Sequence, residues 1–144
     1  MNKITISGVI GFGEVDADEI INQLESFNGD LVVELDSVGG SVVSGIKIAN
    51  AIRDYRAKGN NVEILGGAVV ASIATYIAMQ GTSFTVRDNT TFMIHNAYLP
   101  VIGDYVKLRK MAEISEGLST ILAKDYSKKS KIDEKEIKAL MSEE

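Results

Sequence analysis

The stretch GGAVVASIATYIAMQG, residues Gly66–Gly81, joins a run of small residues to an apolar helical pattern. Ser72 is the only serine in it, and the expected helix begins at this residue and ends at Gly81. The first N–H groups of a helix have no partner within it and form its positive end, so they can stabilise an oxyanion that forms when a serine there attacks a carbonyl. Serine is also a favoured N-cap, and on this stretch alone a cap is the simpler interpretation.

The residues around this stretch alternate between strand and helix patterns. Short apolar or alternating runs predict strands at 3–8, 30–36, 61–67, 82–86 and 91–97. Helical spacing predicts a helix over 16–29 with Asp16 as its cap, and a second helix after the loop DSVGGS. The second helix should turn one face inward, formed by Val43, Ile46, Ile48, Ala49, Ile52 and Tyr55. Because helices separate the strands, we expect an α/β fold with mainly parallel strands.

From Asp104 onward the pattern becomes entirely helical. A long amphipathic stripe runs among lysines and glutamates, formed by Leu108, Met111, Ile114 or Ser115, Leu118, Ile121, Leu122 and Tyr126. A last short helix is expected over 132–141. We therefore expect a single domain over residues 1–144, in which about 104–144 form a helical C-terminal third.

The composition is that of an ordinary soluble globular protein. The chain has 144 residues, of which 45% are hydrophobic and 24% charged, with a net charge of −5 and no cysteine. The negative charge and the lack of a basic stretch argue against nucleic acid as a partner. No stretch has the roughly 18 apolar residues of a membrane helix. The first residues lack the pattern of a signal peptide, so we expect a cytoplasmic protein. We also expect no membrane partner, no metal site and no cofactor.

Two further features lie at the ends of predicted strands. His95 is the only histidine, so it is the one side chain of the type that serves as a base near neutral pH. Gly39 and Gly40 follow a buried strand, where the lack of side chains exposes backbone N–H groups. Taken singly, each has a plain structural explanation, a hydrogen-bonded histidine and a loop turn. Together with Ser72 they are the parts of an acyl-transfer site.

These motifs resemble those of the ClpP-type serine peptidases. The three blocks are LDSVGGSVVSGIKIANAI, GGAVVASIATYIAMQG and FMIHNA, in the family's order and at similar separations. The resemblance extends in outline from near residue 4 to the C-terminal helices. It implies a ClpP/crotonase-like fold, which is a repeated β-β-α spiral with mainly parallel strands and a helical C-terminal third. The departures at Val38, Ala68 and Val70 are similar to those of bacteriophage members.

The resemblance also implies a role for each matching residue. Ser72 would be the nucleophile and His95 its general base, and Gly39 and Ile73 would supply the two oxyanion-hole N–H groups. The family's third catalytic residue is an acid that orients the imidazole, and its place in this chain falls on Glu144. Asp104 and Asp125 are weaker candidates, because each more naturally caps or lies on the long helix, and Glu34 and Asp36 flank the strand before Gly-Gly.

Substrate and partners follow from the same resemblance. The family binds a polypeptide as an added β-strand, which here would contact Gly40, Ser41 and Val42. Residues 105–126 match the handle helix through which two heptameric rings stack, so we expect self-assembly into rings. An ATPase unfoldase or phage capsid and scaffold proteins are the further partners that the family implies. Family members continue past this point with another strand and helix, so the chain appears short at its C-terminus.

The sequence therefore predicts a serine endopeptidase that forms an acyl-enzyme, in phage head maturation or in general protein degradation. One alternative is a catalytically incomplete, ClpP-like assembly subunit, in which Ser72 has no chemical role. Another is a crotonase-type acyl-CoA enzyme, which shares the fold and the two-amide oxyanion hole but needs no serine–histidine pair. A serine–lysine pair is a lesser option, because the MIH motif is present.

Overall fold

Strands and helices alternate through the first two thirds of the chain in the computed structural model, which describes residues 1–143. The chain divides into two compact units, Met1–Met93 and Ile94–Glu144. The first unit contains β1 (Asn2–Ser7), α1 (Ala17–Ser26), β2 (Leu31–Ser37), α2 (Val42–Ala57), β3 (Val62–Ala71), α3 (Ile73–Ala78), β4 (Ser83–Thr85) and β5 (Thr91–Met93). The second contains α4 (Tyr105–Ser130) and α5 (Glu134–Ser142).

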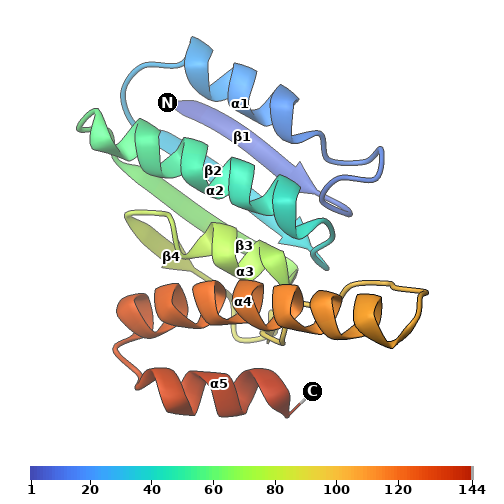
Figure 1. The fold of residues 1–144 in the computed structure, drawn as a ribbon. Coiled ribbons are helices and arrows are strands. Elements are labelled where there is room, and N and C mark those ends of the chain that lie inside the picture. Colours follow the sequence, from blue (N-terminus) through green and yellow to red (C-terminus); the bar gives the residue numbers. More distant parts are fainter. Residues whose placement is uncertain (144) are drawn as a thin grey trace. The chain divides into compact units, whose positions relative to one another are not determined.

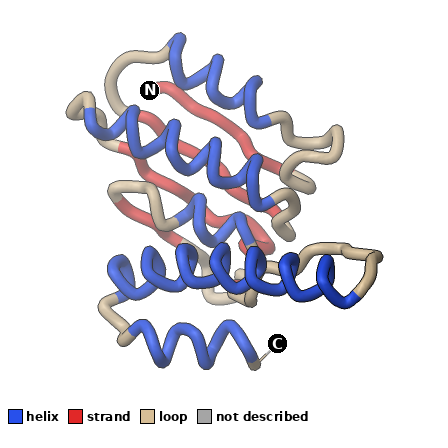
Figure 2. Tube along the Cα trace, viewed as in Figure 1, coloured by secondary structure: helices blue, strands red, loops and turns tan. Residues whose placement is uncertain are grey.

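All five strands belong to one sheet, and every strand pair in it is parallel. The order is β1-β2-β3-β4, and the strands are drawn in red in Figure 2. Strand β5 pairs with the second half of β3, whose residues Val69–Ala71 align with Thr91–Met93. This confirms the predicted α/β class with mainly parallel strands. The structure also places Ser72 directly after the long central strand, beside the end of β5.

The core of the first unit lies between the sheet and its helices. Alternate strand residues are buried, and these are Ile4, Ile6, Leu31, Val33, Leu35, Val62 and Ile64. Helices α1 and α2 lie side by side over one face of the strands (Figure 1) and bury Ile20, Leu24, Ile48 and Ile52. Each such side chain contributes about 1.5–3 kcal/mol when fully buried. The period-two pattern of the strands and the helical spacing therefore together specify the packing of α1 and α2 on the sheet.

Polar caps set where the helices begin. Asp16 caps α1, as predicted, by accepting from the N–H groups of Asp18 at 2.8 Å and Glu19 at 3.4 Å. The hydroxyl of Ser41 caps α2 by accepting from Ser44 N at 3.2 Å. The prediction that Val43 points inward is wrong: it lies in the first turn of α2 and is 68% exposed.

Helices α2 and α3 approach each other closely at a glycine. A Cβ on Gly45 would lie 2.2 Å from Ile73 Cγ1, so only glycine fits at this point of α2. Ile73 is the first residue of α3 and follows Ser72. The contact therefore fixes the start of α3, and with it the backbone that follows the serine.

The second unit is a pair of helices lying side by side (Figure 1). Asp104 caps α4, as its sequence position suggested, by accepting from Val106 N and Lys107 N. The buried contacts come from Leu122, Ala123 and Tyr126 of α4 and from Ile137 and Met141 of α5. Other members of the predicted apolar stripe, Leu108, Ile114 and Ile121, are exposed. Of that stripe, only Leu122 and Tyr126 are buried.

Two of the predicted strands are shorter than expected, and one is longer. Strand β3 continues through the small residues up to Ala71, so the helix within Gly66–Gly81 is limited to Ile73–Ala78. Strand β5 ends at Met93, two residues before His95, whereas the expected strand covered 91–97. The last residues of that segment leave the sheet because they bond to α4 and α5 instead.

Candidate active site

Ser72 occupies a strained turn between β3 and α3. Its φ is 57° and its ψ is −132°, a left-handed region that costs a non-glycine residue about 1–3 kcal/mol. Ser72 is the N-cap residue of α3, but its side chain makes no capping hydrogen bond to that helix, so the serine does not tie down the helix as the cap interpretation expects. A strained serine at a strand-to-helix turn is typical of a nucleophile.

The backbone on both sides of this turn is fixed by hydrogen bonds. Ser72 N donates to Met93 O at 2.9 Å, which ties the turn to the end of β5. Ser72 O accepts from Thr75 N at 3.0 Å and from Thr75 Oγ1 at 2.6 Å. Because Thr75 is fully buried, these bonds are shielded from water. They hold Ser72 in the strained conformation while leaving the residue only half-buried.

The Gly-Gly loop packs directly against the Ser72 side chain. A Cβ on Gly39 would lie 2.6 Å from Ser72 Cβ, 2.9 Å from Ala71 O and 3.1 Å from Ser72 Oγ. Gly39 also has a φ of 98°, which other residues rarely adopt. The structure therefore brings together two of the sequence-predicted site residues, and it requires glycine at this position for both space and conformation.

The N–H of Gly39 is engaged by a residue that the sequence analysis missed. It donates to Ser37 Oγ at 3.0 Å, and Ser37 is 1% exposed. The alternation of β2 gives the signal that would have found it, because Ser37 follows Leu31, Val33 and Leu35 on the buried face of the strand. A serine in that series needs a hydrogen-bonding partner, and the Gly39 N–H is one.

The segment expected to bind substrate is partly used within the chain. Ile10 lies along it, since Ile10 N donates to Gly39 O and Ser41 N donates to Ile10 O, each at 2.8 Å. A Cβ on Gly40 would lie 2.2 Å from Ile10 O, so the two backbones are in close contact. Because Gly40 is the residue between these two bonds, its own N–H and C=O face the edge away from Ile10. Val42 begins α2.

Asp36 has a structural role in this region. The register between β2 and β3 shifts after Leu35, and Asp36 Oδ1 accepts from Val69 N at 2.9 Å within that irregularity. A Cβ on Gly67 would lie 2.6 Å from Asp36 Cγ, so the carboxyl group fills the space beside the glycine. Asp36 thus supports the second half of β3, the segment that leads to Ser72.

His95 lies in the second unit and is 8% exposed. Its ring packs edge-on against Tyr98, with 5.6 Å between the ring centroids. The Nδ1 atom is buried and makes no hydrogen bond with residues 1–143, while the residue has interactions elsewhere. Glu144, the predicted third catalytic residue, lies outside the described residues.

The backbone after His95 is anchored to both helices of the second unit. Asn96 N donates to Met141 O at 3.1 Å, and Ala97 N donates to Ser119 Oγ at 2.9 Å. The hydroxyl of Ser115 donates to Ala97 O. Ser115 and Ser119 are one turn apart on α4, so together they satisfy both main-chain groups of Ala97. The helical pattern of the sequence indicated Ser115 only as an alternative member of an apolar stripe and gave no signal for Ser119.

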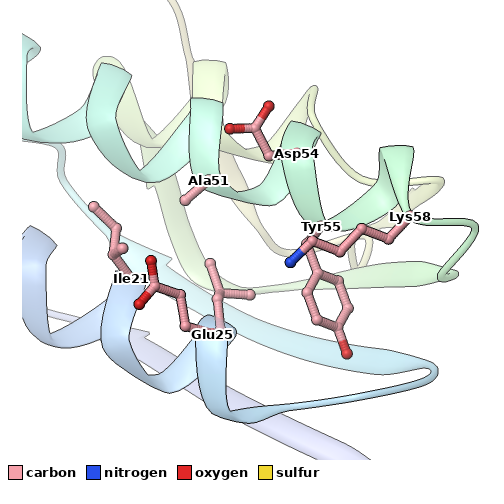
Figure 3. Close-up of a pocket in the computed structure, with 7 residues that line it drawn as sticks. Ile21, Glu25, Ala51, Asp54, Tyr55 and Lys58 are labelled. Carbon is pink, nitrogen blue, oxygen red and sulfur yellow. The ribbon is translucent and has the colours of Figure 1, made fainter.

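Two grooves of the first unit are not lined by Ser72. One, of about 290 Å³, lies between α1 and α2, with Glu25, Asp54 and Lys58 exposed around it (Figure 3). Tyr55 also lines it, but its hydroxyl donates to Gly29 O. The other, of about 580 Å³, lies on the sheet and includes Asp36 and Arg87. Neither joins a nucleophile to a base.

Within residues 1–143, no cluster of three or more histidine, aspartate or glutamate side chains could hold a metal ion. None of the helices described is both long and apolar enough to cross a membrane.

The α/β fold thus places a strained serine directly after its central strand and packs a glycine loop against that serine. The family model of the Clp protease matches residues 4–144. The chain belongs to the Clp protease family, which confirms the resemblance and the fold expected from it. No curated protein matches the chain.

Proposed function

We propose that this protein is a serine peptidase that cleaves polypeptides through an acyl-enzyme, with Ser72 as nucleophile and His95 as general base. The observation that supports this most is the conformation of Ser72, which is strained, makes no bond as a helix cap and lies against Gly39. A structural serine needs none of these features. Membership of the Clp protease family supports the same chemistry.

The reaction uses the groups around Ser72 in two steps. Ser72 Oγ attacks the substrate carbonyl carbon as His95 accepts the hydroxyl proton, and the oxyanion receives hydrogen bonds from the N–H groups of Gly39 and Ile73. His95 then protonates the leaving amine, and the acyl-enzyme forms. Water, deprotonated by His95, then attacks the acyl carbonyl carbon, and His95 returns the proton to Ser72 Oγ as the acyl group leaves. Each oxyanion donor contributes about 3–4 kcal/mol to transition-state stabilisation.

The substrate lies, in this proposal, along Gly40, Ser41 and Val42. Gly40 supports it best, because its main-chain groups face the edge that Ile10 does not occupy. We assign Glu144 the orienting role toward His95, on the basis of its place in the sequence.

Assembly is the second part of the proposal. Proteins of this family form rings and act on polypeptides, and we propose a heptameric ring, stacked in pairs, for this chain. Four exposed apolar residues before and at the start of α4, here called the α4 patch, support an interface: Tyr98, Ile102, Tyr105 and Val106. A cytoplasmic protein that works with an ATPase unfoldase, or with phage capsid and scaffold proteins, fits this proposal.

Labelling with a fluorophosphonate, followed by peptide mapping, tests the activity. We expect label on Ser72 of the assembled wild type and none on Ser72→Ala, whereas Ser26→Ala, which changes an exposed helix-end serine, is labelled normally. His95→Ala should slow labelling by about 10³-fold or more. Label that persists unchanged in Ser72→Ala would show that another residue reacts. No label on the assembled wild type would favour the alternative of an inactive assembly subunit.

A further inference from the structure

The proposed oxyanion donor at Gly39 is occupied within the chain itself. Its N–H donates to Ser37 Oγ at 3.0 Å, and Gly39 and Ser37 are both buried. An N–H group bonds strongly in only one direction, because the bond weakens steeply as it departs from linearity. An N–H that points at Ser37 is therefore not offered to a substrate oxygen beside Ser72. In this arrangement the Gly39 N–H is closed to an oxyanion at Ser72.

The Ser37 hydroxyl is itself fixed on its other side. It donates to Gly8 O at 2.6 Å, and Gly8 N donates to Asp36 O at 3.1 Å. The hydroxyl thus connects the Gly39 N–H to the end of β1. With both partners in place, Ser37 satisfies a buried donor that would otherwise lack an acceptor, and such a donor costs about 1–3 kcal/mol.

The backbone of the loop permits this N–H to turn. The N–H of Gly39 belongs to the peptide unit that joins it to Val38, and Val38 is 58% exposed. The bonds to Ile10 involve Gly39 O and Ser41 N, which belong to other peptide units. Rotation of this unit changes ψ of Val38 and φ of Gly39, and Gly39, whose φ is 98°, has no side chain to resist it. The first peptide unit can therefore rotate while the contacts with Ile10 stay in place.

We propose that Ser37 is a positioning residue that masks the Gly39 N–H in the resting protein and releases it when an oxyanion forms at Ser72. This inference rests on the proposed function, since the oxyanion is its trigger. A charged oxygen is a stronger acceptor than a neutral hydroxyl, so the exchange of partners is favourable only when the charge develops. The Gly39 N–H then stabilises the transition state without binding the ground state, which is the condition for faster catalysis.

The variants Ser37→Ala and Ser37→Thr test the masking role. Alanine removes the acceptor, whereas threonine keeps a hydroxyl. The measurement is the rate constant for reaction with a fluorophosphonate, in which Ser72 Oγ bonds to phosphorus, fluoride leaves and the hydroxyl proton passes to the base. We expect Ser37→Ala to react about fivefold faster than the wild type, as the loss of one neutral hydrogen bond allows. Ser37→Thr should react at about the wild-type rate, because its hydroxyl still accepts from the Gly39 N–H. If Ser37 had only a structural role, its replacement by alanine would not make Ser72 react faster.

The outcomes separate this inference from the proposed function. Equal or slower labelling of Ser37→Ala at Ser72 overturns the masking role and leaves the peptidase assignment intact. Faster labelling of Ser37→Ala at Ser72 supports the masking role. No labelling of any variant, the wild type included, overturns the peptidase assignment and the masking role with it.

A second measurement needs no substitution at the buried Ser37. In the ¹⁵N-labelled wild type, phosphonylation of Ser72 should move the amide signal of Gly39, because its acceptor changes from Ser37 to the adduct. Gly59 also has a positive φ, of 90°, and has no atom near its missing Cβ, so its signal is the reference. A Gly39 signal that stays in place while Ser72 is fully labelled overturns the inference.

Discussion

At the scale of single residues, a comparison of Gly39 with Gly59 separates the effect of crowding beside Ser72 from the effect of a positive φ alone. Gly39 and Gly59 have φ values of 98° and 90°, but a Cβ meets Ser72 and Ala71 only at Gly39. We predict that Gly59→Ala lowers the free energy of unfolding by about 1–2 kcal/mol. Gly39→Ala should lower it further and abolish labelling of Ser72. Chemical denaturation and labelling of the two variants give the comparison, and equal effects on both measurements would contradict it.

The residues of the site differ in how far the sequence predicts them. Ser72, Gly39 and Gly40 stand out because small residues and a hydroxyl interrupt apolar patterns. The strain at Ser72 is not visible in the sequence, because positive φ at a non-glycine residue results from tertiary contacts such as the bond to Met93 O. Ser37 was missed although its place on the buried face of β2 marked it as a residue with a partner.

At the scale of elements, two helix glycines show how closely α2 and α3 pack. A Cβ on Gly45 would lie 2.2 Å from Ile73 Cγ1, whereas a Cβ on Gly117 in α4 meets nothing. We predict that Gly117→Ala stabilises the protein by up to about 1 kcal/mol through helix propensity. Gly45→Ala should instead destabilise it by about 1–3 kcal/mol because it displaces Ile73. Thermal unfolding measures both changes, and stabilisation by Gly45→Ala would contradict this packing.

The segment after His95 gives a second prediction at this scale. Ala97 N donates to Ser119 Oγ, so Ser119→Ala should speed hydrogen exchange at the Ala97 amide and cost about 1–3 kcal/mol through an unsatisfied buried donor. Ser127→Ala is the control, because Ser127 also lies on α4 but bonds to Ile132 O. Unchanged exchange at Ala97 in the Ser119 variant would show that this anchor is not formed.

The elements themselves followed from the sequence where one pattern dominates. The period of two in β1 and β2, and the caps Asp16 and Asp104, predict the right types of element at nearly the right places. The extension of β3 through Ala68–Ala71 was not predicted, because these residues were assigned to the approach to the next helix. Pairing with β5 and the bond from Val69 N to Asp36 hold them in the strand. The early end of β5 depends on α4 and α5, which are distant in sequence.

At the scale of the whole molecule, the α4 patch predicts self-association. Native mass spectrometry should show an oligomer, and Ile102→Glu should shift it toward smaller species because Ile102 is 92% exposed in the single chain. Ile132→Glu, which changes a 37% exposed isoleucine after α4, is the matched control. A wild type that is monomeric at micromolar concentration would contradict the proposed assembly.

The central claim is that Ser72 and His95 act as one catalytic pair, and the single histidine of the chain makes this directly measurable. The ring-proton signals of His95 need no assignment against other histidines. Phosphonylation of Ser72 changes the group with which the imidazole exchanges a proton, so we predict that these signals move on labelling and do not move when Ser72→Ala is given the same reagent. Ring signals that remain in place after complete labelling of Ser72 would contradict the account.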